Sequence, residues 1–193
     1  MRPDPAPEPS SYLIGRVLLP LRGFLGFTFC FAGLQKLANP RFFDAADPAS
    51  IQSQLAGAVR FSPIHALISP LTHVAVPLGI LIAFSELAIG VATLLGLWTR
   101  LAAIVGILLS FMLFLTVSFH ASPYYTGSDI VFVFAWTPLA LAGAGSVLSL
   151  DEAIARRVHQ RDGAHRQSAY YSYAADEVGR REVTLKAGAT AAA

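Results

Sequence analysis

Four long apolar runs dominate the pattern of hydrophobic and polar positions along this chain. They cover residues 17–37, 74–97, 101–119 and 130–148. A helix of about 20 apolar residues is long enough to cross the hydrocarbon core of a bilayer. The pattern therefore predicts an all-α integral membrane protein. We expect a four-helix transmembrane bundle, with the membrane domain extending over residues 13–150.

The segment between the first two runs, residues 49–71, follows a different pattern. It is neither long enough nor apolar enough to cross a membrane. Ile51, Leu55 and Ala58 fall on one face of a helix, and Pro63 would interrupt that helix. A single apolar face is typical of helices that lie in the membrane interface. We therefore predict a short amphipathic helical insert between spans 1 and 2.

The two ends of the chain carry neither a span nor a core pattern. Residues 1–12 are polar and rich in proline, and residues 151–193 are largely polar and basic before becoming rich in alanine and glycine. Segments with so little apolar content do not bury enough surface to order themselves. We predict a disordered N-terminus and a largely disordered basic tail.

Composition supports a membrane protein, because 54% of the residues are hydrophobic and 13% are charged, whereas soluble domains contain about 25% charged residues. The formal net charge is +2. In a soluble chain basic residues would suggest a nucleic-acid partner, but here they flank apolar runs, where they set the orientation in the membrane. No nucleic-acid partner is expected.

The basic residues are distributed unequally between the two sides of a four-span topology. Both termini and the turn at residues 98–100 fall on one side, and Lys36, Arg41 and Arg60 fall on the other. The first side carries Arg2, Arg16, Arg100, Arg156, Arg157, Arg161, Arg166, Arg180, Arg181 and Lys186. Cytoplasmic segments are enriched in Lys and Arg. We therefore predict that both termini are cytoplasmic.

Glu86 is the acidic residue that lies deep within an apolar run. A charged side chain at that depth costs roughly 2.5–3.5 kcal/mol on insertion scales, so it requires a partner. Arg22 lies one to two turns into the first run, and the estimated depths allow an Arg22–Glu86 pair. Such a pair either fixes the register of two helices or allows Glu86 to accept and relay protons. Glu86 and Arg22 are therefore candidate catalytic residues.

A second set of polar and aromatic residues is predicted to gather at the outer face. Lys36 either extends to the interface or helps to bind a carbonyl-bearing or anionic ligand. His120 and Asp129 bracket a short loop that contains Tyr124 and Tyr125. We predict that a quinone head group binds between Lys36, His120 and Asp129. In this hypothesis both tyrosines stack on the ring, His120 acts as a proton carrier, and the insert covers the site. The alternative is an ordinary interfacial group of aromatic and histidine residues.

Cysteine and histidine usage favours neither haem nor metal chemistry. The single cysteine, Cys30, excludes an intramolecular disulfide and a dithiol relay, because exchange needs a second thiol. His73 and His120 lie at the ends of predicted spans, whereas a b-type haem would need two facing histidines within the bundle. We expect no haem and no metal site.

Several short motifs resemble the DoxX family. They are Leu21-Arg22-Gly23 with Gln35-Lys36-Leu37, then Glu86-Leu87 with Gly96-Leu97-Trp98-Thr99-Arg100. The segment Ser118-Phe119 with Pro123-Tyr124-Tyr125-Thr126-Gly127-Ser128-Asp129-Ile130 is similar to the DoxD branch. The resemblance covers about residues 13–150. It implies a multi-pass protein of a bacterial-type plasma membrane that is similar to the small membrane subunit of thiosulfate:quinone oxidoreductase.

This resemblance implies a membrane subunit that passes electrons from a sulfur compound, such as thiosulfate, to quinone and works with a partner protein subunit. Quinone is then the expected cofactor and the bilayer the expected environment. Two alternatives remain open. The chain could be a non-catalytic membrane anchor or assembly subunit for a partner oxidoreductase, or a transporter of small solutes.

The predicted orientation can be tested with reporter fusions. A reporter placed after Ser149 should report a cytoplasmic location, and one placed within residues 45–50 should report the outside, because of the asymmetry in basic residues. Paired alkaline phosphatase and green fluorescent protein fusions measure both sides. The reverse pattern would overturn the orientation.

Overall fold

The computed structural model describes residues 9–119, 121–145 and 147–158 of the 193-residue chain. These residues form helices joined by turns and contain no strand. The chain divides into two compact units, Met1–Asp151 and Glu152–Ala193. The membrane helices all belong to the first unit, and the described part of the second, residues 152–158, is helical.

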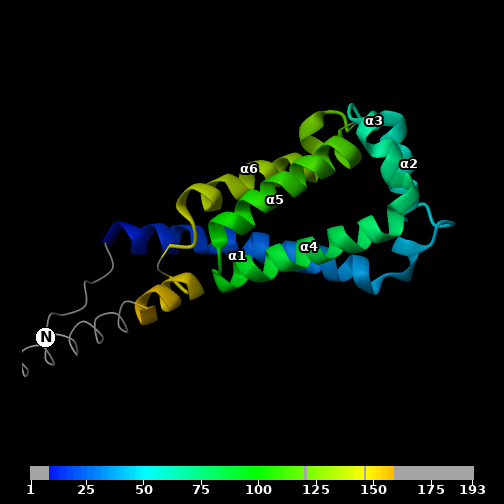
Figure 1. The fold of residues 1–193 in the computed structure, drawn as a ribbon. Helices are drawn as coiled ribbons and strands as arrows, with labels where there is room; N and C mark the ends of the chain where they lie inside the picture. The colour runs from blue at the N-terminus through cyan, green and yellow to red at the C-terminus, as the bar shows by residue number, and fades with distance from the viewer. Residues whose placement is uncertain (1–8, 120, 146, 159–193) are drawn as a thin grey trace, which may run out of the picture. The chain divides into compact units, whose positions relative to one another are not determined.

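Within its described residues, the first unit contains the longer helices α1, α2, α4, α5 and α6, the short helix α3, and several tighter or wider helical turns (Figure 1). In chain order they are α1 (Pro9–Ala38), η1 (Pro40–Phe43), α2 (Ile51–Phe61), α3 (His65–Ile68), η2 (Ser69–Val74), α4 (Ala75–Leu95), α5 (Thr99–Leu113), the π-helical η3 (Phe114–Ser118), η4 (Tyr124–Thr126) and α6 (Ser128–Ala142).

Three helical segments are long and apolar enough to cross a membrane: Tyr12–Ala38, His65–Leu95 and Thr99–Ser118. The predicted fourth span, residues 130–148, is shorter in the structure. α6 has 15 residues, which corresponds to roughly 22 Å of helix, and it ends where Gly143 adopts a φ of 77°. The four-span count is therefore not confirmed. If α6 does not cross, the two reporter fusions will lie on the same side.

Both predicted disordered ends differ in part from the structure. α1 begins at Pro9, so residues 9–12 are helical, because proline is compatible with the first turn of a helix. Residues 151–158 are also helical. Residues 1–8 and 159–193 lie outside the described part of the chain.

Two antiparallel helix pairs form the membrane unit: α1 packs along α4, and α5 packs along α6 (Figure 1). Between them lies an apolar core made by Leu25, Phe29, Ile89, Ala103, Trp136 and Leu139. Phe29 meets Trp136 edge to face, with 4.9 Å between the ring centroids. Trp136 is fully buried and lies over Gly106 of α5, where a Cβ atom would come within 2.6 Å of the indole.

Direct backbone contact joins α1 to α4. A Cβ atom on Gly33 would lie 2.5 Å from the Ala83 carbonyl oxygen, and one on Gly90 would lie 2.5 Å from the Cys30 nitrogen. In lipid, helix association depends on close packing, because the surrounding hydrocarbon is as apolar as the helix surface. These two glycines therefore set the distance between the helices that carry Lys36 and Glu86.

The insert predicted at residues 49–71 corresponds to α2, α3 and the start of η2. A second apolar cluster packs it against the start of α4 and includes Phe42, Ile51, Leu55, Ala58, Ile68 and Ala75. α2 contacts both α4 and η3, at the end where α4 and α5 diverge in Figure 1. We call this the insert end of the unit, and the end that contains the α4–α5 turn the turn end.

Substitution of Gly33 tests the close approach of α1 and α4. Gly33→Ala should destabilise the protein by about 1–3 kcal/mol, because the added methyl group meets backbone atoms. Gly23→Ala in the same helix is the control: nothing lies within 4 Å of its added Cβ. Gly23→Ala should leave the free energy of unfolding unchanged or raise it by up to about 1 kcal/mol. Denaturant unfolding in detergent measures both, and equal effects would contradict the packing argument.

Candidate functional site

Glu86 is paired with Lys36. The Lys36 Nζ atom lies 2.8 Å from Oε1 and 2.7 Å from Oε2 of Glu86. The Glu86 side chain is 4% exposed and that of Lys36 is 24% exposed. Gly33 brings the two helices together beside Leu87, and Lys36 follows Gly33 by about one turn on the same face of α1. The buried carboxylate therefore receives its counter-charge from the insert end of α1.

The predicted Arg22–Glu86 pair is wrong. Arg22 is buried, and its guanidinium donates hydrogen bonds to three carbonyl oxygens beyond α6: Ala144 at 3.3 Å, Val147 at 3.0 Å and Leu148 at 2.8 Å. Along α1, Arg22 and Lys36 are separated by roughly 21 Å. Estimates of depth from the ends of the runs could not distinguish which of the two cations in the first apolar run meets Glu86. Arg22 closes the turn end of the unit.

Asp129 joins the Lys36–Glu86 pair in an electrostatic cluster. It lies in the first turn of α6 and interacts electrostatically with both Lys36 and Glu86. Its Oδ2 atom accepts a hydrogen bond from the Ser118 hydroxyl at the end of η3. The structure thus brings together Lys36, Glu86 and Asp129, three of the residues singled out in the sequence, and adds Ser118, which belongs to the segment that resembles the DoxD branch but was not predicted as a site residue.

Tyr124 and Tyr125 do not form the walls of a ring-binding site. Each is 62% exposed, and they pack edge to face against each other with centroids 5.7 Å apart. Neither contributes to the cavity described below. Both side chains are on the exposed side of η4. His120, the predicted proton carrier, lies outside the described residues.

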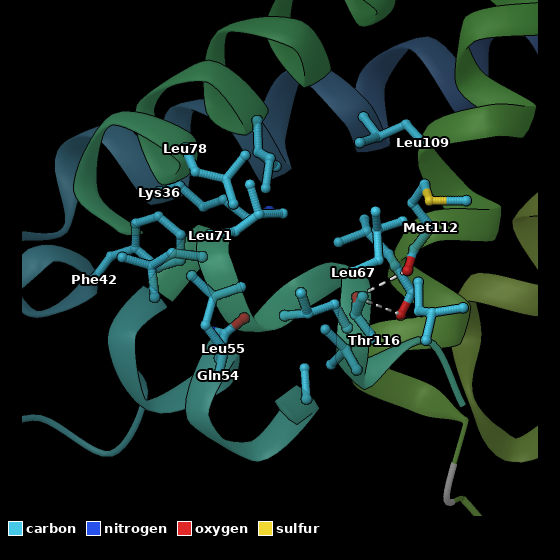
Figure 2. Close-up of a pocket in the computed structure, with 17 residues that line it drawn as sticks. Lys36, Phe42, Gln54, Leu55, Leu67, Leu71, Leu78, Leu109, Met112 and Thr116 are labelled. Atoms are coloured by element: carbon cyan, nitrogen blue, oxygen red, sulfur yellow. Dashed lines mark hydrogen bonds between the residues drawn. The ribbon is translucent and has the colours of Figure 1, made fainter. Parts of the chain in front are cut away.

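A cavity of about 270 Å³ lies at the insert end, between α4, α5 and the insert (Figure 2). Among the described residues, Lys36 is the one charged member of its lining. The walls are otherwise mainly aliphatic, with Leu78 and Ile82 from α4 and Leu109 and Met112 from α5. α2, α3 and η2 supply much of the remaining wall, together with Phe42 of η1 and with Thr116 and Val117 of η3, so the insert covers one side of the cavity. An apolar site with a single ammonium suits a mainly apolar ligand that has one hydrogen-bond acceptor.

The polar cluster can supply both hydrogen bonds and protons. A lysine ammonium has three N–H donors, and the two bonds to Glu86 leave one for an acceptor in the cavity. The cluster contains two carboxyl groups, those of Glu86 and Asp129, but one cation, Lys36. One carboxyl group can therefore hold a proton without leaving the lysine unpaired.

The lining residues of α5 were not predicted from the sequence. Leu109 and Met112 belong to the same apolar run as residues that face away from the bundle. Hydrophobicity alone cannot separate a cavity wall from a lipid-facing surface in a membrane helix. Lys36, in contrast, could be identified as a candidate from the sequence. A cation at the end of an apolar run either extends to the interface or binds a ligand.

A double-mutant cycle tests the ion pair. Glu86→Gln and Lys36→Met should each destabilise the protein by about 3–5 kcal/mol, because each leaves a charge without its partner. The double variant should recover much of this loss. A cycle of Glu86→Gln with Arg22→Gln is the control and should be additive. Unfolding in detergent measures both cycles, and equal coupling energies would contradict the observed pairing.

Comparison with known proteins identifies the family. The DoxX family model matches residues 17–121, more than half of the chain. No curated protein and no solved structure matches the chain. The matched segment contains the paired Lys36 and Glu86, the whole insert and the cavity walls, and it ends before Asp129. Together with its three helices of membrane-spanning length, this match shows that the chain is a membrane protein belonging to the DoxX family.

Proposed function

We propose that this protein is the membrane subunit of a quinone-linked redox system and that its cavity binds the quinone head group. One observation carries the proposal: the Lys36 ammonium, held by Glu86, lines an otherwise largely aliphatic cavity among membrane-spanning helices. This combination suits a quinone, because its ring is apolar and its carbonyl oxygens accept hydrogen bonds.

The size and chemistry of the cavity fit a quinone head group. Its volume of about 270 Å³ lies just below the roughly 300–1,000 Å³ usual for small-molecule sites. A single ring system is therefore the appropriate size. Lys36 would hold one carbonyl oxygen, and the aliphatic side chains of Leu78, Ile82 and Leu109 would contact the ring faces.

When bound, a quinone takes up two electrons and two protons to form a quinol. In this chain, Lys36 orients the acceptor oxygen and Glu86 keeps the ammonium in place through both carboxylate oxygens. Asp129 provides a second carboxyl group that interacts electrostatically with that pair. Lys36 lines the cavity, and the two carboxyl groups would hold protons behind it. Arg22 has no part in this arrangement, because its donors bind the backbone beyond α6.

The electrons would come from a reduced sulfur compound such as thiosulfate, through a partner protein subunit. The similarity of residues 123–130 to the DoxD branch supports this donor class. Cys30 is the single cysteine of the chain, so two-thiol chemistry would require a partner. We propose a bacterial-type plasma membrane as the location, with both termini in the cytoplasm and the insert end outside.

Removal of the Lys36 charge tests the proposal. Lys36→Met should weaken quinone binding at least about tenfold, the effect of losing a hydrogen bond from a charged donor. Arg41→Met is the control, because Arg41 is an exposed cation of η1 outside the cavity lining. Calorimetric titration of the purified protein in detergent with the dimethoxy-methyl-benzoquinone head group measures both affinities.

The same titration distinguishes the alternative function. If the folded wild-type protein binds no quinone, the result favours a non-catalytic anchor or assembly subunit. His120→Ala tests the sequence-based part of the proposal and should also weaken binding. If Lys36→Met and His120→Ala both bind as tightly as the wild type, the head group does not lie at this end of the unit.

A further inference from the structure

We propose that the cavity opens sideways into the bilayer between the insert and the end of α5, and that the hydrocarbon tail of the ligand lies in this opening. The inference rests on the proposed function for the identity of the head group. It adds a tail-binding site, a route from the membrane, and the residues that form both. We call this opening the lipid portal and define its rim as Leu67, Leu71, Met112 and Val117.

The lining of the cavity changes from buried to exposed along its length. Phe42, Leu55 and Ile68, which belong to the lining, are at most 7% exposed. The four rim residues are 37–65% exposed, although they line the same cavity. Figure 2 shows Leu67 and Met112 on the side of the cavity that α5 forms. The cavity is therefore continuous with the surface at its apolar rim.

The surroundings of the rim identify what lies outside it. All four rim residues are apolar, and they belong to the two segments His65–Leu95 and Thr99–Ser118 that are long and apolar enough to cross a membrane. A surface of this kind faces lipid tails. A hydrocarbon tail that leaves the cavity here stays in hydrocarbon, whereas a polar ligand using this route would have to give up its hydration.

The volume of the cavity is sufficient for the head group of the ligand but not for its tail. About 270 Å³ accommodates a ring system but leaves no room for a long isoprenoid chain. The ammonium of Lys36 draws the carbonyl-bearing ring into the cavity, so the tail must extend toward the apolar rim. The occupant that fits both ends is a lipid-soluble molecule with a polar ring and one long hydrocarbon tail.

The rim is held in place by a contact between the insert and η3. The Ser62 hydroxyl, at the C-terminal end of α2, donates a hydrogen bond of 2.7 Å to the Leu115 carbonyl oxygen. Leu115 lies in the π-helical segment, whose wider turn alters the usual helical hydrogen bonding, and such segments often occur at functional sites. This bond fixes the distance between the insert and α5 on one side of the portal.

The experiment narrows the portal without touching the polar cluster. Met112→Trp places a larger side chain at the rim, and Leu108→Trp is the matched control on the same helix. Leu108 is 57% exposed, is one turn away and is not a cavity residue. The probes are a long-tailed ubiquinone and its tail-less dimethoxy-methyl-benzoquinone head group. Binding is titrated with the full-length protein in phosphatidylcholine nanodiscs.

We expect the wild type to bind the tailed probe at least tenfold more tightly than the tail-less one. Met112→Trp should remove most of this difference and leave the affinity for the tail-less probe within twofold of the wild type. Leu108→Trp should change neither affinity. If Met112→Trp does not fold, as judged by circular dichroism and gel filtration, Leu67→Trp takes its place.

The outcomes separate the two proposals. If the wild type binds both probes equally, or if the rim variant weakens both equally, the portal is wrong while the head-group site stands. If the wild type binds neither probe, the quinone function is wrong, and the portal inference is overturned with it.

Discussion

A carboxylate in hydrocarbon must be neutralised by a cation or by a proton, and much of this structure follows from how Glu86 meets that requirement. Lys36 reaches both oxygens of Glu86 across the α1–α4 interface. That reach is possible because Gly33 lets the two backbones touch. The formation of the ion pair therefore depends on the close packing of small residues between α1 and α4. A larger side chain at Gly33 would separate the ion pair as well as the helices.

The two ends of the membrane unit differ in the contacts that they contain. At the turn end, Arg22 binds the carbonyls that follow α6, and the Asp151 carboxylate accepts a hydrogen bond of 2.9 Å from the Trp98 nitrogen. The Ser149 hydroxyl also donates to the Gly96 carbonyl at 3.0 Å. This end is closed by polar contacts to the backbone. At the insert end, α4 and α5 diverge, and the space between them is lined mainly by aliphatic side chains (Figure 2).

The contrast between Arg22 and Lys36 shows why a buried charge must be interpreted with its contacts. Both are cations of α1, and both satisfy buried acceptors. Arg22 donates its hydrogen bonds to main-chain oxygens, which makes it a structural residue. Lys36 donates two of its three N–H groups to Glu86, and the third is available to an acceptor in the cavity that Lys36 lines. By burial alone, Arg22, which is 3% exposed, would rank ahead of Lys36 as a candidate site residue.

By itself, the sequence determined the properties that depend on composition and local periodicity. These are the membrane environment, the helical insert, the presence of one costly carboxylate and the DoxX resemblance. The structure decided which cation meets Glu86, that α6 ends at Ala142, that Tyr124 and Tyr125 face outward, and that Met112 lines a cavity while Leu108 does not. The reason is physical. In water an apolar stripe marks the buried face of a helix, but in lipid both faces are apolar. The rotation of each helix is then set by close packing and by a few polar contacts, which only the assembled structure contains.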